Sequence, residues 1–225
     1  PLDYNEKEGK FNWELVFCEL YAGGKYNNNN GGMYEYSLGL NGLGACATQY
    51  SSEYMDVEVT RDGFIYTLHF EKGINKGGLK KSETQSKKTG SVIRWKPDRD
   101  VFTDIDIPIE FLQDTLEKQA MTNAGLKFIL YTETETGMQM NEYYFKNGIV
   151  DYLSDTVGDN SLTQIEVWEA ERKGRDREDK PEYRVKMQIA FCFSQTVTLL
   201  EYYHNSSWLE HGGSPDKAVT NAFVY

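Results

Sequence analysis

Three glycines within six residues mark the segment of this sequence best suited to chemistry. They lie in Gly39-Leu40-Asn41-Gly42-Leu43-Gly44, which the small residues 45–48 follow. Glycine lets a backbone approach a ligand closely, and the first turn of a helix leaves N–H groups free, so this segment suits a phosphate site. Its glycine order is not that of a dinucleotide fold, and the Gly-Lys-Ser/Thr ending of a Walker loop is absent. A glycine-rich turn that serves close helix packing stays open as the alternative.

A polar segment precedes these glycines. Residues 23–32 consist of glycines and asparagines around Lys25 and Tyr26. Because Gly and Asn tolerate positive φ and bury little, we expect a mobile loop. Such a loop before a phosphate site can close over the ligand as a lid, and Lys25 would then reach a terminal phosphate. A solvated loop lysine is the alternative for Lys25.

Several stretches resemble the ATPase region of the bacterial gyrase B family, type II topoisomerases that belong to the GHKL ATPases. These stretches are Leu20–Tyr26, Tyr34–Gly44, Lys88–Trp95 and Leu126–Leu130. The resemblance is close from Pro1 to about Asp155. It is weaker through Tyr225, where Tyr202–Asn205 and Glu210–Ser214 are similar to the start of the transducer domain. The Tyr-Ala-Gly-Gly-Lys-Tyr segment is a topoisomerase feature and argues against a MutL-like protein.

The resemblance implies a role for individual residues. The lid-end motif, whose amides hold the triphosphate, corresponds to Gly39, Leu40, Asn41, Gly42, Leu43 and Gly44. The beginning of the lid corresponds to Gly23, Gly24 and Lys25, with Lys25 at the γ-phosphate. Tyr34 matches a lid tyrosine near the nucleotide, Ser91 a threonine that helps to fix the adenine, and Ile93 an apolar wall. Pro1 and Arg61 match the edge and the mouth of the pocket, where the family binds coumarin-type inhibitors.

The resemblance also has departures and gaps. Asn41 stands where gyrase usually has His, Leu38 stands where Gly is usual, and the lid has an Asn-rich insertion, so gyrase and topoisomerase IV both stay open. In the family, the general-base Glu, the Mg²⁺-binding Asn and the adenine-reading Asp precede the position of Pro1, and the transducer lysine follows that of Tyr225. We therefore assign no catalytic and no metal-binding residue and expect no ATP hydrolysis by this polypeptide alone. The absence of a starting Met suggests a piece of a longer protein.

The resemblance implies an enzyme as the parent protein. ATP binding and hydrolysis, with Mg²⁺, would drive dimerisation of the ATPase region and DNA strand passage. The implied partners are ATP, DNA, a topoisomerase A subunit and a second copy, with no membrane. The alternatives are a noncatalytic nucleotide-binding or dimerisation module and the B subunit of topoisomerase IV.

The elements that would position these residues indicate an α+β fold. By resemblance it is a GHKL (Bergerat-type) sandwich lacking its N-terminal elements over 1–158, followed by the start of the transducer over 159–225. Hydrophobic periodicity predicts helices over 12–21, 45–50, 108–120 and 148–153 and one that begins near Ser214. It predicts strands over 55–59, 64–68, 91–95, 127–132, 141–145, 163–170, 183–193 and 196–202, with a hairpin turn at 61–63. We expect Asn12 to cap the first helix and Ser214 the last.

The polar segment 72–90 contains six lysines and several glycines, and we expect a long solvated loop there. The alternative is a DNA-binding patch around Lys80-Lys81 and Lys87-Lys88. We prefer the loop because no aromatic residues are interleaved for stacking.

Composition limits the remaining classes. The chain has 225 residues and a net charge of -11, which repels nucleic acid in general. No apolar run approaches the length of a membrane helix. Cys18, Cys46 and Cys192 are an odd number in apolar or small-residue settings, and we expect buried reduced thiols and a cytoplasmic protein. No Cys/His spacing suits zinc, and the pair His204 and His211 lacks a third ligand.

Overall fold

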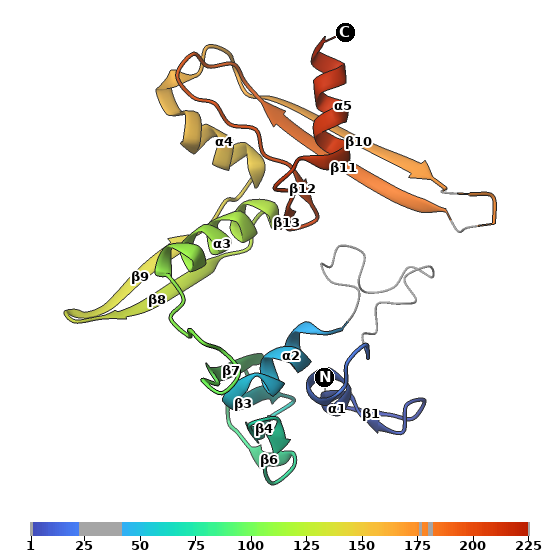
Figure 1. The fold of residues 1–225 in the computed structure, drawn as a ribbon, viewed down its shortest axis with the longest axis vertical. Helices are drawn as coiled ribbons and strands as arrows, with labels where there is room; N and C mark the ends of the chain where they lie inside the picture. The colour runs from blue at the N-terminus through green and yellow to red at the C-terminus, as the bar shows by residue number, and fades with distance from the viewer. Residues whose placement is uncertain (1, 23–41, 176, 180–181, 225) are drawn as a thin grey trace. The chain divides into compact units, whose positions relative to one another are not determined.

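Residues 2–22, 42–175, 177–179 and 182–224 are described by a computed structural model and group into two compact units (Figure 1). The first unit holds the described residues up to Asp106, and the second begins at Ile107. The predicted domain boundary between residues 158 and 159 comes from the resemblance and stays a prediction. In the described part of the chain, no helix is both long and apolar enough to span a bilayer.

In its described residues, the first unit combines two short helices with an antiparallel sheet. Its elements are β1 (Tyr4–Asn5), β2 (Lys10–Phe11), α1 (Asn12–Cys18), α2 (Gly44–Tyr50), β3 (Ser52–Arg61), β4 (Phe64–Glu71), β5 (Ile74–Asn75), β6 (Lys80–Glu83) and β7 (Gly90–Pro97). The main sheet has the order β5-β4-β3-β7, and β6 also pairs with β4.

The turn between β3 and β4 sets the register of the sheet. Asp62 and Gly63 have φ of 54° and 77°, as a two-residue hairpin turn requires, and this confirms the predicted turn. Arg61 therefore faces Phe64, and the pairing continues to Tyr54 and Glu71. The predicted strands 55–59, 64–68 and 91–95 are all present.

Alternation along these strands gives the sheet two different faces. The inner face, which packs against α1, carries Met55, Val57, Leu68 and Phe70, all nearly inaccessible to solvent. Phe17 of α1 joins this core, with its ring centroid 5.9 Å from that of Phe70. The opposite or outer face carries polar side chains.

The first helix begins at Asn12 as predicted, but its end and its cap differ from the prediction. It ends at Cys18, and Tyr21 has a φ of 62°, so Leu20 and Tyr21 lie beyond the helix and are exposed. Asn12 is not its cap, because the helix already includes Asn12. The Phe11 N–H instead donates to the Glu14 carboxylate at 2.8 Å. The small-residue helix over 45–50 is confirmed as α2, which contacts α1 and β3.

The segment 72–90 is not one long loop. It contains β5 and β6, and β6 pairs with β4 from Phe64–Glu83 to Thr67–Lys80. All four residues of β6 are exposed, so this edge strand forms through backbone hydrogen bonds and not through an apolar pattern.

The second unit contains two long hairpins and three α-helices within its described residues. Its elements are α3 (Ile109–Thr122), β8 (Phe128–Thr134), β9 (Gly137–Tyr143), α4 (Ile149–Val157), a 3₁₀ helix (Gly158–Asn160), β10 (Glu166–Gly174), β11 (Tyr183–Phe191), β12 (Tyr203–His204), β13 (Ser207–Trp208) and α5 (Gly213–Val224). The strands pair as β8-β9, β10-β11 and β12-β13.

The core of this unit is smaller than that of the first. Ala120, Met121 and Phe145 are buried, and Tyr203 packs against them. The hairpin β12–β13 is tied to α3 by the Gln119 side chain, which donates to the Ser206 carbonyl at 3.0 Å.

Two sequence predictions fail in this unit. Residues 196–202 form no strand, because the N–H groups of Thr196 and Val197 donate to the Ser194 hydroxyl and turn the chain. The last helix begins at Gly213, so Ser214 lies inside the helix and does not cap it.

Candidate functional site

The structure describes six of the predicted site residues. These are Gly42, Leu43, Gly44, Arg61, Ser91 and Ile93. The remaining predictions, Pro1, Gly23, Gly24, Lys25, Tyr34, Gly39, Leu40 and Asn41, lie outside the described residues.

The end of the glycine segment leads directly into α2. Gly42 has a φ of 61°, which favours glycine strongly, and α2 begins at Gly44. The Leu43 carbonyl accepts the Ala47 N–H at 2.8 Å, as the first turn of a helix requires. A Cβ at Gly44 would meet no described atom within 4 Å. Close helix packing therefore does not explain this glycine, which weakens the alternative to a phosphate site.

Ser91 and Ile93 lie on the inner face of the sheet. They pair with Val59 and Val57, whose side chains pack in or against the core beside α1. Both residues of β7 are nevertheless exposed, Ile93 by 52%. Among the described residues, the core thus covers the β3–β4 half of this face and leaves the β7 half open. The exposed inner-face residues of β7 are Ser91, Ile93 and Trp95, so this half offers one hydroxyl and two apolar side chains, and we call it the open floor.

Arg61 is already engaged. Its two terminal nitrogens lie 2.7 and 3.2 Å from the two carboxylate oxygens of Asp3, a bidentate ion pair. The Arg61 hydrogen bond and charge lower the pKa of Asp3. A ligand at the predicted pocket mouth would therefore meet a guanidinium whose hydrogen-bonding edge Asp3 occupies.

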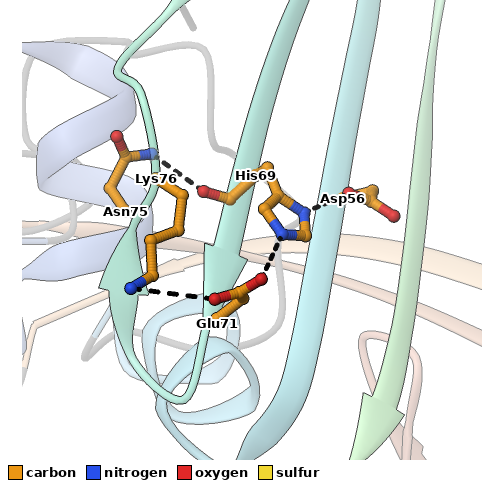
Figure 2. Close-up of polar contacts among 5 residues, drawn as sticks. All are labelled: Asp56, His69, Glu71, Asn75 and Lys76. Carbon is orange, nitrogen blue, oxygen red and sulfur yellow. Dashed lines mark hydrogen bonds and ion pairs between the residues drawn. The ribbon is translucent and has the colours of Figure 1, made fainter.

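The outer face carries a group of polar residues that sequence reasoning missed. Figure 2 shows His69 between two carboxylates, with Nδ1 2.6 Å from Asp56 and Nε2 3.2 Å from Glu71. Lys76 lies 3.7 Å from Glu71, and the Asn75 side chain donates to the His69 carbonyl. Hydrogen bonds to Asp56 and then to Glu71 raise the pKa of His69, because both ring nitrogens donate in the imidazolium form. The hairpin turn at 61–63 already implies that residue 56 faces residue 69.

The second unit contains another group that the sequence did not indicate. The Tyr203 hydroxyl donates to the Glu201 carboxylate at 2.9 Å. Burial, followed by the charges of Glu201 and Glu117, raises the pKa of Tyr152 to about 12. Burial also raises the pKa of Glu117. The raised pKa values favour the neutral forms of Tyr152 and Glu117, and we assign both residues a structural role.

Metal binding and thiol chemistry have little support. In the parts of the chain that the structure describes, no group of three His, Cys, Asp or Glu side chains could hold a metal ion. The three cysteines are free, but only Cys46 is fully buried, while Cys18 and Cys192 are partly exposed. Burial raises the pKa of Cys18 and of Cys46, so both thiols are poor nucleophiles.

Comparison with known proteins shows what this chain resembles. No family model matches it. The DNA gyrase B protein of Staphylococcus epidermidis is 29% identical over 219 residues, which cover 96% of this chain and 32% of the relative. The DNA gyrase B protein of Staphylococcus aureus is 29% identical over 220 residues, with the same coverage. The chain thus spans about a third of the length of these curated relatives.

Solved structures give the same result for the fold. The 43K ATPase domain of Thermus thermophilus gyrase B, in complex with an aminocoumarin, matches 87% of this chain and 46% of that chain, with a TM-score of 0.62 and 21% identity. The topoisomerase IV ATP-binding domain of Francisella tularensis, in complex with a small-molecule inhibitor, matches 76% of this chain and 46% of that chain, with a TM-score of 0.54 and 22% identity. The chain is therefore similar in sequence to DNA gyrase B over nearly all of its length, and its α+β fold is that of the GHKL ATPase domains of gyrase B and topoisomerase IV.

Proposed function

We propose that this chain forms part of the ATP-binding region of a type II topoisomerase B subunit. The observation that carries the proposal is the combination of sequence similarity over 96% of the chain with an open floor at Ser91 and Ile93. Adenine would lie on this floor, with the Ser91 hydroxyl as a polar contact and Ile93 as an apolar wall. This assignment follows the similarity to gyrase B and extends it to individual residues.

The triphosphate would meet the glycine segment and the lid. Gly42, Leu43 and Gly44 would present backbone amides, together with Gly39, Leu40 and Asn41. Gly23, Gly24, Lys25 and Tyr34 would contribute from the lid, with Lys25 at the terminal phosphate. Pro1 and Arg61 would stand at the edge and mouth of the pocket.

Hydrolysis would need groups beyond the nucleotide contacts proposed above. A positioned base and a metal ion are required to activate water and to neutralise charge at the γ-phosphate. By resemblance to the family, the general base and the Mg²⁺ ligand lie outside this chain. We therefore propose nucleotide binding without turnover for this chain, and ATP-driven dimerisation and DNA passage, with Mg²⁺ and a topoisomerase A subunit, for a longer cytoplasmic parent.

The test is calorimetric titration of the chain with a nonhydrolysable ATP analogue. Gly42→Ala places a Cβ at a φ of 61°, which costs about 1–2 kcal/mol of backbone strain and should weaken binding about tenfold. Gly125→Ala is the matched control, since Gly125 also has a positive φ of 78° with open space around it and lies in the second unit. Equal affinities for the two variants would contradict the assignment of Gly42.

A further inference from the structure

A groove of about 310 Å³ lies on the outer face of the main sheet. Lys80 of β6 pairs with Thr67, Thr67 with Glu58, and Glu58 with Val92 of β7, so one row of residues crosses the groove. Arg94, which pairs with Asp56 two positions further along β7, also lines it. The two outer strands β6 and β7 thus each place one cation at a margin of the groove.

These two cations differ from their neighbours in how they are paired. Lys72, Lys76 and Lys96 each lie within 4.0 Å of a carboxylate. Lys80 and Arg94 form no such ion pair with any described carboxylate. Asp56 already accepts a hydrogen bond from His69, which leaves Glu58 as the one unpaired carboxylate among the groove's described residues.

The connection between β6 and β7 adds two more lysines. The Thr84 N–H donates to the Gly63 carbonyl at 2.9 Å, so the connection passes the β3–β4 turn before β7 begins. Lys87 and Lys88 lie in this connection, are exposed and have no ion-pair partner in the described structure. Residues 80–94 therefore contain five cations and one carboxylate, in a chain whose net charge is -11.

Lys81 provides an internal contrast. It pairs with Tyr66 on the inner side of the sheet, and its ammonium lies 3.7 Å from the centroid of the Phe64 ring. The charge of Lys81 is therefore held against aromatic rings and away from the groove, although it is the neighbour of Lys80 in sequence.

We propose that Lys80, Lys87, Lys88 and Arg94, here called the basic rim, contact the phosphate backbone of duplex DNA. This inference rests on the proposed function, because it assigns a contact surface to the DNA on which the parent would act. The rim lacks the large apolar anchors of a protein interface, and unpaired lysines and arginines are the groups that neutralise phosphates. Glu58 opposes such binding and should limit its strength.

The experiment measures binding of a fluorescein-labelled 20-base-pair duplex to the whole chain by anisotropy, as a function of salt. Four phosphate contacts predict that affinity falls about 150-fold between 50 and 200 mM salt. Removing two cations in Lys80→Gln/Arg94→Gln should reduce this fall to about 12-fold. Glu58→Gln should tighten binding severalfold.

The matched control is Lys72→Gln/Lys81→Gln, which removes the same charge outside the rim and should keep the full salt dependence. Circular dichroism checks the fold of each variant, and Lys87→Gln/Lys88→Gln replaces the first variant if that one does not fold.

The proposal is overturned if the duplex does not bind at 50 mM salt, or if the control loses as much salt dependence as the rim variant. It is also overturned if polyglutamate displaces the duplex as well as unlabelled DNA does, since an acidic protein would then fit equally.

Failure here is distinguishable from failure of the proposed function. Titration with the ATP analogue reports on the inner face and does not involve the rim. Nucleotide binding without duplex binding would overturn the basic rim alone, whereas duplex binding without nucleotide binding would overturn the nucleotide site alone.

Discussion

The two faces of the main sheet come from the same strands and have opposite chemistry. The inner face packs an apolar core against α1, while the outer face carries His69, two carboxylates beside it, and Lys80 and Arg94 of the basic rim. Because side chains alternate along a strand, each neighbouring pair such as Lys80 and Lys81 is divided between the two environments. The proposed nucleotide site and the proposed DNA surface can therefore lie on one small sheet without sharing a residue.

The inner face should dominate stability. Phe70 is fully buried in its core, and Phe70→Ala should lower the free energy of unfolding by about 3–5 kcal/mol. Val92→Ala, on the outer face and 57% exposed, is the comparison and should change it by less than about 0.5 kcal/mol. Urea denaturation measures both. Similar losses for the two variants would show that the faces do not differ as described.

The outer face should contribute a smaller, pH-dependent amount. Asp56 and Glu71 raise the pKa of His69 above its usual 6.5, so the imidazolium stabilises the fold fully below pH 6.5. This stabilisation is lost as the pH rises through the raised pKa. The difference in urea midpoint between the wild type and His69→Gln should therefore shrink between pH 6 and pH 9. A difference that grows with pH would contradict the ion pairing of His69. Because Asp56 and Glu71 are largely exposed, we expect the effect to be small.

Much of the first unit could be predicted from the sequence. The turn at Asp62 and Gly63 fixes the register of β3 and β4, and with it the pairing of Asp56 and His69. The strand β6 could not be predicted, because Lys80–Glu83 has no apolar alternation and forms as an edge through its backbone. The aromatic partners of Lys81 were missed for the same reason, since they come from β4 and not from the local sequence.

The errors elsewhere have local causes. Residues 196–202 alternate as a strand would, but the Ser194 hydroxyl takes the N–H groups that a neighbouring strand would need. Phe11 is the N-cap of α1 in place of Asn12, and the Glu14 carboxylate in the first turn accepts the Phe11 N–H. The residues of the candidate site were predicted from the family resemblance alone. The exposure of Ser91 and Ile93 on the inner face could be seen only in the structure.

Hydrogen exchange with a nonhydrolysable ATP analogue tests the central claim most directly. If the nucleotide lies on the inner face, exchange of amides in residues 42–48 and 91–95 should slow on saturation. Exchange over β11 in the second unit (Tyr183–Phe191) should not change. Unchanged exchange at both inner segments in the presence of saturating analogue would contradict the nucleotide site proposed for this chain.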